Sequence, residues 1–405
     1  MPIINRVADL HGEITAWRHD IHAHPELLYD VHRTAATVAE KLRSFGCDEV
    51  VTGIGRTGVV GVIRGGRGGD GGRVIGLRAD MDALPIEEAN DVPYKSTVPG
   101  KMHACGHDGH TAMLLGAARY LAETRNFAGD AVVIFQPAEE GGGGARAMLA
   151  DGLFSRFPKP DMGFALHVGP GPYGFVSYRP GVINSTSDSL SVLFTGKGGH
   201  GSRPHVTIDP VMMAGHFIVD VQSVISREKD AAKFGVVTIG SVQAGNAGNV
   251  IPDTALLRGT IRSYDDDTRA KMIEGVQRTA KAVALMAGAP PPEVKITAGA
   301  KAVINDADLA ARGGAVLKAA FGDKAVLLPA PGSASEDYSE FIIAGVPSFY
   351  FGIGGLDPKA VAQAAATNTP LPGNHSPEFA PVPEPTIRTG TQAMSLVLLD
   401  VLQKK

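Results

Sequence analysis

Hydrophobic and polar positions at the start of the chain recur with the period of an α-helix. This pattern predicts helices over about residues 3–23 and 33–45, the first of which stops just before Pro25. The period then changes, because short β-branched runs at 59–64 and 73–77 are typical of strands. The Gly-rich stretch between these two runs predicts a loose hairpin loop.

From residue 74 onward, strand-like and helix-like segments alternate. The order is strand, His-rich loop, helix, strand, Gly-rich turn with a helix, and strand, with the regular segments at 74–80, 110–124, 130–137, 144–152 and 162–168. This alternation predicts an α/β fold with a parallel-rich sheet flanked by helices. Ligands of such sheets gather beyond the carboxyl ends of the strands, and Asp80, Glu139 and His167 all lie just after or at the end of an apolar strand.

A different pattern begins near residue 184. Strand, helix, two strands, helix and strand follow one another at 190–196, 208–225, 236–243, 255–263, 267–286 and 294–299. This β-α-β-β-α-β order is the ferredoxin-like one. Because helix and strand patterns resume after residue 300, we expect a discontinuous first domain, residues 1–184 and 300–405, interrupted by an inserted α+β domain at 185–299.

Composition and charge narrow the classes of function. The 405 residues suffice for two domains with sizeable cores. The net charge is −4 and the basic residues are scattered, so we expect no nucleic-acid partner. No apolar run approaches the length of a membrane span, and the amino terminus lacks the apolar core of a signal peptide. Cys47 and Cys105 are the only cysteines, too few for a disulfide framework, which favours a reducing cytoplasm.

Two Gly-rich segments match part of the sequence pattern of nucleotide-binding loops but lack the rest of it. Residues 53–58, Gly-Ile-Gly-Arg-Thr-Gly, match G-x-G-x-x-G but lead into a strand, so we expect no dinucleotide site there. Four glycines follow Glu140, but no Gly-Lys-Ser/Thr comes after them, which disfavours a phosphate-binding loop. Glycines at this point would instead let the backbone approach closely.

Residues 103–110, His-Ala-Cys-Gly-His-Asp-Gly-His, carry an unusual density of metal-binding side chains. In an extended segment, Cys105 and His107 present a sulfur and a nitrogen to the same side, and Zn, Mn, Ni or Co ions accept both donors. His103, Asp108 and His110 are then expected to support these ligands or to cap the following helix. The alternative is a polar loop ahead of a helix.

Acidic pairs follow two of the predicted strands. Asp80 and Asp82 are two residues apart and would point to one side of an extended chain, or they form a solvated turn. Glu139 and Glu140 are adjacent, and two buried carboxylates repel each other unless a cation holds one and a proton occupies the other. An exposed acidic turn is the alternative for this second pair.

Two histidines stand far from the His-rich loop in the sequence. His167 closes an apolar strand, and His375 lies in a loop between a Pro-rich segment and the last helix. Either residue alone could be a structural histidine. Together with the cysteine, histidine and glutamate residues above, they complete a plausible set of ligands for a metal-dependent hydrolase, whose bound cations lower the pKa of water.

Eight segments carry a family resemblance when they are taken in order: RHDIHAHPEL, GLRADMDALPI, MHACGHDGHTAMLLGAA, FQPAEEGGGGA, GKGGHGSRPH, GNVIPDTALLRGTIRS, SEDYSEF and GNHSPEF. The chain resembles hippurate hydrolases and N-acyl-amino-acid amidohydrolases of the dinuclear aminoacylase and carboxypeptidase-G-like superfamily, from about residue 15 to residue 400. Asp80-x-Asp82 and Cys105-Gly-His107 replace the His-x-Asp and bridging Asp of other branches. This departure favours an amidohydrolase over a dedicated peptidase.

The resemblance implies a role for each matching residue. It implies two divalent ions, Zn, Mn, Co or Ni, whose ligands are Cys105, His107, Glu140, His167 and His375. Glu139 matches the general base, while Asp80, Asp82 and Asp108 would support the ligands. The inserted domain resembles a dimerisation or lid domain, so a homodimer is implied. In it, His200 resembles a residue that polarises the scissile carbonyl, often from the partner subunit, and Asn249 and Arg262 match positions at the substrate's carboxylate side.

These assignments together predict a metal-dependent amidohydrolase that acts on a small molecule. It would cleave the amide bond of N-acyl amino acids of benzoyl or acetyl type, with Glu139 moving the proton of the attacking water. Arg262 could hold the carboxylate of the substrate through a bidentate pair. A dipeptidase or a deacetylase of a biosynthetic N-acyl amino acid is the alternative. A thiol amidase with Cys105 as nucleophile, and a non-catalytic binding protein, are the rival classes.

Overall fold

The computed structural model describes residues 3–67 and 72–402, and the contacts within it divide the chain into two units. The large unit consists of Met1–Ile183, Ile304–Pro331 and Asp337–Lys405, and the inserted unit consists of Asn184–Val303 and Gly332–Glu336. The short second segment of the inserted unit is held there by hydrogen bonds, because Ser185 N donates to Ala334 O at 2.7 Å. The division therefore differs from the sequence-based boundaries mainly in assigning residues 332–336 to the inserted unit.

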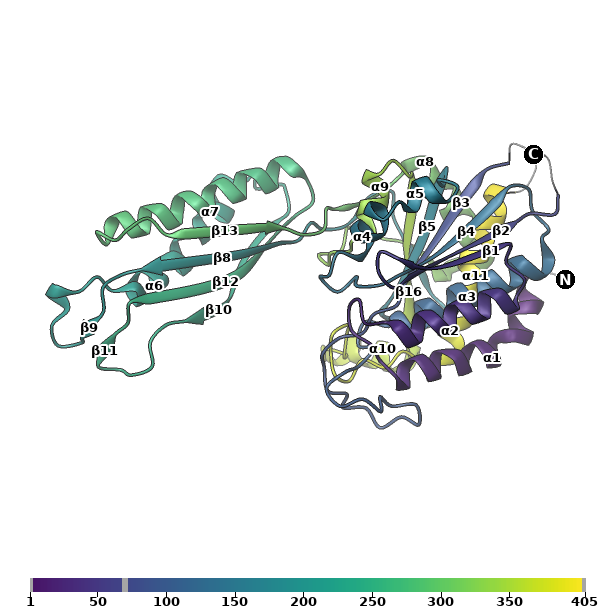
Figure 1. Ribbon diagram of the computed structural model, residues 1–405, viewed down its shortest axis with the longest axis horizontal. Coiled ribbons are helices and arrows are strands. Elements are labelled where there is room, and N and C mark those ends of the chain that lie inside the picture. The colour runs from purple at the N-terminus through teal and green to yellow at the C-terminus, as the bar shows by residue number, and fades with distance from the viewer. Residues whose placement is uncertain (1–2, 68–71, 403–405) are drawn as a thin grey trace. The chain divides into compact units, whose positions relative to one another are not determined.

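The large unit is built around an eight-stranded sheet (Figure 1). Its strand order is β1-β2-β4-β3-β5-β16-β6-β15, and the four central strands, β4, β3, β5 and β16, are parallel. Antiparallel pairs join β1 to β2, β2 to β4 and β16 to β6, and a parallel pair joins β15 to β6. The strands are Glu49–Ile54 (β1), Gly58–Arg64 (β2), Val74–Asp80 (β3), Asp130–Gln136 (β4), Met162–Pro172 (β5), Val176–Tyr178 (β6), Ala325–Leu327 (β15) and Ser348–Leu356 (β16).

The hairpin predicted between β2 and β3 is wrong. β4 lies between these two strands, antiparallel to β2 and parallel to β3, and it satisfies the backbone hydrogen bonds of both. Residues 68–71 of the predicted loop lie outside the described residues. The segment 53–58 instead forms the turn of the β1–β2 hairpin, where Gly55 has a φ of 59°. This turn leads into the strand β2 and not into a helix, as the sequence predicted.

Helices flank both faces of the large sheet (Figure 1). On one face, α1, α3 and α11 pack against one another over the apolar side chains Leu77, Phe135 and Leu166. On the other face, α4 contacts β4 and α9. The helices of this unit are Ile3–Ala23 (α1), His32–Ser44 (α2), His107–Thr124 (α3), Gly144–Ala150 (α4), Leu153–Arg156 (α5), Ala307–Phe321 (α8), Ser339–Ile343 (α9), Pro358–Thr367 (α10) and Pro383–Leu402 (α11).

The inserted unit has the ferredoxin-like strand order β10-β12-β8-β13, with every neighbouring pair antiparallel. Helices α6 and α7 pack on the sheet around a separate core that includes Phe194 and Phe217. The α/β fold class and the inserted α+β unit predicted from the sequence are thereby confirmed. The elements are Asp188–Thr195 (β8), Gly199–His200 (β9), Pro210–Asp220 (α6), Gly235–Gln243 (β10), Val250–Ile251 (β11), Thr254–Ser263 (β12), Asp266–Met286 (α7) and Glu293–Ala298 (β13).

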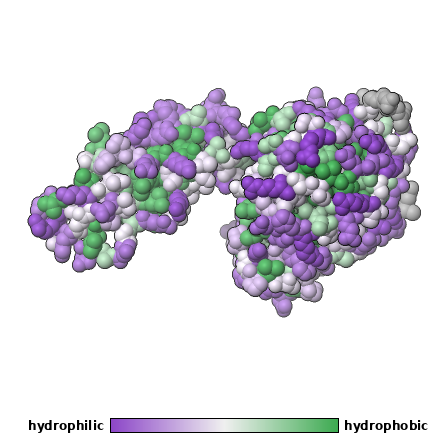
Figure 2. Space-filling model, viewed as in Figure 1, coloured by the Kyte–Doolittle hydropathy of each residue, from purple (hydrophilic) through white to green (hydrophobic). Residues whose placement is uncertain are grey.

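Shorter elements lie between those given above, among them the helical turns Pro204–Val206, Val224–Glu228 and Gly322–Lys324. The short strands Gly181–Asn184 (β7) and Val303–Asn305 (β14) pair with each other near the two ends of the main inserted segment. On the face drawn in Figure 2, apolar residues reach the surface of both units in patches among polar ones. Over residues 3–67 and 72–402, no helix combines the length and the apolar character needed to cross a bilayer.

Candidate active site

The residues expected to bind metal come together in the large unit. The sulfur of Cys105 and nitrogens of His107 and His167 form one group, and Cys105, Glu140 and His375 form a second group. Within each group the candidate ligand atoms lie within 4.8 Å of one another. Cys105 belongs to both groups, so the two are contiguous. Segments separated by up to 270 residues thus supply one cluster of metal-type donors.

Two of the histidines are oriented as metal-binding histidines require. The Nδ1 of His107 lies 2.7 Å from the carbonyl oxygen of Asp82, and the Nδ1 of His167 lies 2.8 Å from the carbonyl oxygen of Val168. Because a carbonyl oxygen only accepts, each Nδ1 carries a proton, so the Nε2 of either ring in its neutral form would present a lone pair to the cluster. The Nε2 of His107 is buried and has no hydrogen-bond partner.

The remaining donors have the chemistry that a divalent transition metal accepts. Cys105 Sγ lies 3.5 Å from His167 Nε2. Glu140 Oε1 is 3.2 Å from His375 Nε2 and 3.9 Å from His107 Nε2. The unpartnered, buried Nε2 of His107 is costly in a protein interior, and a cation among these donors would satisfy it. The residues present therefore fit a bound divalent metal.

Burial sets the protonation of two of these donors. It raises the pKa of the Cys105 thiol to about 12, even though His107 favours the thiolate. It lowers the pKa of His167 to about 3, which leaves the imidazole neutral at pH 7. Catalytic thiols need a lowered pKa, whereas a thiol that ionises on meeting a cation suits a metal ligand. The electrostatics therefore disfavour the thiol-amidase alternative.

Asp80 supports the cluster from the end of β3. Its Oδ1 is 2.6 Å from His110 Nδ1, its Oδ2 is 2.7 Å from the Arg78 guanidinium, and the same Oδ2 is 3.7 Å from His107 Nε2. Burial alone would raise the pKa of Asp80, but Arg78, His107 and His110 hold it well below its usual range. The second ring nitrogen of His110 accepts the Val168 N–H at 2.9 Å, so both of its nitrogens are already engaged.

Asp82 shapes the turn that carries the two adjacent glutamates. Its Oδ1 accepts the N–H of Glu139 at 2.9 Å, and its Oδ2 accepts the N–H of Glu140 at 3.1 Å. Ala138, just before them, has a φ of 53°, a left-handed conformation that an alanine adopts only where its surroundings impose it. As a result, carboxylate oxygens of Glu139 and Glu140 lie within 4.8 Å of His107. Glu139 thus lies beside the cluster of expected ligands.

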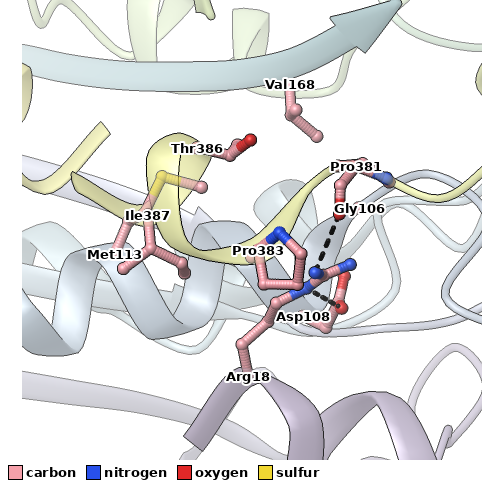
Figure 3. A pocket seen from close by; sticks show the side chains of 10 residues that line it. Arg18, Gly106, Asp108, Met113, Val168, Pro381, Pro383, Thr386 and Ile387 are labelled. Carbon is pink, nitrogen blue, oxygen red and sulfur yellow. Dashed lines mark hydrogen bonds and ion pairs between the residues drawn. The ribbon is translucent and has the colours of Figure 1, made fainter. Parts of the chain in front are cut away.

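Asp108 belongs to a buried ionic network behind the Cys105–His107 loop. Its Oδ2 accepts Arg18 Nε at 2.8 Å and lies 2.8 Å from His22 Nδ1, while Arg18 also donates to Pro381 O at 2.9 Å (Figure 3). The other His22 nitrogen is 3.1 Å from Glu88 Oε1. This network ties α1 to the first turn of α3, where Asp108 follows directly on the expected ligand His107.

Replacing His22 by Gln should destabilise the protein most at acidic to neutral pH. Burial alone would lower the pKa of His22, but Asp108 and Glu88 raise it above the ordinary value of 6.5. The stabilisation from charged His22 is complete below that value and is lost as the pH rises through the folded pKa. We expect a loss of about 3 kcal/mol in the free energy of unfolding at pH 6, because the buried carboxylates of Asp108 and Glu88 lose the cation between them, which leaves only Arg18 to pair with Asp108.

Urea unfolding at several pH values from 6 to 9 measures this effect. The difference between wild type and His22→Gln should narrow as the pH rises. His24→Gln is the matched control, because the side chain of His24 is 42% exposed and its substitution should change little. A deficit that stays constant over the whole pH range would contradict the ionic role of His22.

Several of these residues were missed by the sequence reasoning. Arg18 and His22 occur in RHDIHAHPEL, and Asn374 occurs in GNHSPEF, but the resemblance assigned no role to these three residues. The sequence did carry a signal for Arg78, because a charged residue inside an apolar strand needs a buried partner of opposite charge. Its guanidinium contacts Gln136 at 2.9 Å and Asp337 at 3.3 Å in addition to Asp80.

Two predicted site residues of the inserted unit are neighbours. In the β9–β11 pair His200 lies opposite Val250, and Gly201 N donates to Asn249 O at 2.8 Å. The Ser202 N–H donates to His200 Nδ1 at 3.1 Å, so the ring proton of a neutral His200 is on Nε2. Both His200 and Asn249 are exposed. An exposed Nε2–H is the group needed to donate to a substrate carbonyl.

Arg262 lies on β12 in the four-stranded sheet of the inserted unit, at the end farther along the strands from the β9–β11 pair. It donates to Ser333 O at 3.1 Å, in the segment where the chain re-enters the unit, and its neighbour Ile261 pairs with Asp188. The β9–β11 arm instead follows the Thr195–Thr254 end of β8 and β12. At ~3.3 Å per strand residue, Arg262 is roughly 25 Å along β12 from Thr254. Within one copy of this unit, Arg262 and His200 therefore do not share a small ligand.

A cluster of cysteine, histidine and glutamate donors at the edge of a parallel sheet defines a metal-dependent hydrolase, and comparisons with known proteins agree. Residues 76–370 match the sequence model of peptidase family M20/M25/M40, so the chain belongs to this family. A hippurate hydrolase of Campylobacter jejuni is 43% identical over 345 residues, which cover 84% of this chain and 88% of the relative. Thermostable carboxypeptidase 2 of Saccharolobus solfataricus is 36% identical over 406 residues, 99% and 98% of the two chains.

A solved structure shares the whole architecture. The YXEP protein of Bacillus subtilis, described as a dinuclear metal-binding peptidase of the M20 family, superposes with a TM-score of 0.79 at 29% identity. The match covers 98% of this chain and 99% of that one. The protein is therefore a metal-dependent hydrolase of this family, an enzyme that cleaves amide bonds and binds divalent metal.

Proposed function

We propose that the five clustered donors hold two divalent ions and that Glu139 is the general base for hydrolysis of the amide bond. The observation that carries this proposal is the place of Cys105 in both ligand groups, one with His107 and His167 and the other with Glu140 and His375. One sulfur shared by two sets of nitrogen and oxygen donors is suited to a pair of ions. Zn, Mn, Co and Ni all accept this mixture of ligands.

Each of the remaining site residues then has its own role in the reaction. The bound ions would supply Lewis acidity that activates water and polarises the substrate carbonyl. Glu139 takes a proton from the attacking water and returns it to the leaving amine. His200 donates its Nε2–H to the oxygen of the carbonyl as negative charge develops there. Arg262 and Asn249 bind at the carboxylate side of the substrate.

The substrate class that we propose is an N-acyl amino acid of benzoyl or acetyl type with a free carboxylate. Similarity to a hippurate hydrolase supports the acyl-amino-acid part. Similarity to a carboxypeptidase over almost the whole chain keeps the dipeptidase alternative open. A deacetylase of a biosynthetic N-acyl amino acid is the other alternative. The acyl group of the preferred substrate distinguishes these three activities.

A substrate panel tests this proposal. We would compare hippurate, N-acetyl amino acids and dipeptides, with N-benzoylglycinamide as a matched control that lacks the carboxylate of hippurate. The proposal predicts the highest kcat/KM for an N-acyl amino acid and a loss of about tenfold or more for the carboxamide, because a charge-assisted bidentate bond is lost. Equal rates for hippurate and its carboxamide would contradict carboxylate recognition, and faster cleavage of dipeptides would favour the dipeptidase.

We further propose a homodimer in which each subunit completes the active site of the other. The separation of Arg262 from His200 within the inserted unit supports this, because one copy does not bring both residues to one substrate. Helix α6 also exposes Val211, Met212 and Val219, the last of which is 71% exposed. An apolar helix face of this kind is suited to contact with a second copy. The two free thiols, Cys47 and Cys105, support a cytoplasmic enzyme.

Replacing Cys105 by Ala should lower the metal content from two ions per chain to one or fewer. The sulfur is the one donor common to both groups, so its loss weakens both sites. Elemental analysis of the purified protein measures the metal content. Cys47→Ala is the matched control, because Cys47 is packed against the apolar core and should leave the metal content unchanged. Full metal occupancy in Cys105→Ala would show that Cys105 is not a ligand.

A further inference from the structure

The loop that carries His375 is held to the site by the side chain of the preceding residue. Asn374 Nδ2 donates to the carbonyl oxygen of Cys105 at 3.1 Å and to that of Val168 at 3.0 Å. The same nitrogen lies 3.8 Å from the sulfur of Cys105. One amide group thus links the loop to the segment before α3 and to β5.

These contacts reach a third expected ligand through a shared carbonyl. The Val168 oxygen that accepts from Asn374 also accepts the Nδ1–H of His167 at 2.8 Å. Asn374 therefore fixes the carbonyl that sets the orientation of the His167 ring. A residue that acts through another in this way influences a metal site without binding the metal.

The backbone of His375 needs this support. Its φ is 69°, in the left-handed region, which residues other than glycine rarely adopt. Such a conformation persists only where surrounding contacts impose it. The N–H of His375 donates to Ala104 O at 2.8 Å. The Asn374 side chain binds the following carbonyl, that of Cys105. Together the two bonds aim the imidazole of His375 at Glu140, 3.2 Å away.

We propose that Asn374 is a positioning residue that sets the relative places of Cys105, His167 and His375 and donates to the sulfur of Cys105. This inference rests on the proposed metal site. All three groups around Nδ2 are acceptors, so the amide nitrogen, and not the amide oxygen, must face them. A donor beside a thiolate withdraws charge from it and thereby tunes it as a ligand, as partners of metal ligands do.

The test compares Asn374→Ala and Asn374→Ser in protein loaded with zinc or cobalt. Asn374→Ala should weaken zinc binding by roughly 10- to 100-fold in chelator competition, the usual cost of removing a partner of a metal ligand. In the cobalt protein, the thiolate-to-cobalt charge-transfer band should shift, because the sulfur loses its donor. Asn374→Ser keeps one hydroxyl donor and should show smaller changes of the same sign.

Asn305→Ala is the matched control. Asn305 Nδ2 also bridges two carbonyl oxygens, those of Arg179 at 2.9 Å and Tyr350 at 2.8 Å, but neither segment carries an expected ligand. This variant should lose stability and keep the zinc affinity and the cobalt band of the wild type. A purely structural role for Asn374 would make the two alanine variants behave alike.

Each outcome decides the matter. Wild-type zinc affinity with an unshifted cobalt band in Asn374→Ala would overturn the role of Asn374, and if that variant does not fold, the same result in Asn374→Ser would do so. A wild-type protein that binds no cobalt would overturn the proposed metal site itself, which separates the two failures.

Discussion

Glu139→Gln should lower kcat by a factor of roughly 10² to 10⁴ while the metal content stays at the wild-type value. Glutamine keeps the size of the side chain and the backbone bond from Glu139 N to Asp82, but it removes the carboxylate that accepts a proton. The five clustered donors are untouched by this change. Steady-state kinetics on an N-acyl amino acid, together with elemental analysis of the same sample, measures both quantities.

Glu384→Gln is the matched control for this substitution. Glu384 lies on α11, its side chain is 54% exposed, and its replacement should leave kcat unchanged. A Glu139→Gln enzyme with near-normal kcat and full metal content would rule out Glu139 as the general base. A loss of both metal and activity would instead make Glu139 part of the metal site.

Mixing two inactive variants should restore activity if subunits share their active sites. His200→Ala should lower kcat by roughly 10²- to 10³-fold, because the oxyanion loses a hydrogen-bond donor. In a mixed dimer of Glu139→Gln and His200→Ala subunits, one of the two sites combines an intact Glu139 with an intact His200. Random exchange between symmetric dimers should then give about one quarter of the wild-type activity.

Subunit exchange must be shown independently, for example by native mass spectrometry of differently tagged chains. Each variant mixed only with itself is the control and should remain inactive. A mixture that contains mixed dimers and has no more activity than its parents would show that His200 does not act across the dimer. The same experiment reports the oligomeric state, so a monomeric protein would also contradict the arrangement.

Local patterns predicted most of the elements in this chain. The apolar run at 74–80 forms β3 with the same limits, and the helix expected over 3–23 is α1, because both patterns are strong and uninterrupted. The five expected ligands also come together, since strand ends and adjoining loops meet at one edge of a parallel sheet. His167 and His375 stood out by their places, at a strand end and in a loop before the last helix, and the resemblance to a family then implied that both are ligands.

Long-range pairing accounts for what the sequence did not predict. β4 enters between β2 and β3 because backbone bonding over the whole sheet, and not the loop between the two strands, decides which strands are neighbours. Arg18 and Asp108 are 90 positions apart and pair only after α1 packs on α3. The distance between Arg262 and His200 follows from the direction of β12, which no local motif encodes.

Metal removal and replacement tests the central claim most directly. The purified enzyme would be stripped with a chelator, assayed on hippurate or the best N-acyl amino acid of the panel, and titrated with Zn, Mn, Co or Ni. We predict that the metal-free protein is inactive and that activity returns to a maximum at two ions per chain. Full activity in the metal-free protein, lost on alkylation of Cys105, would contradict the metal mechanism and favour a thiol amidase.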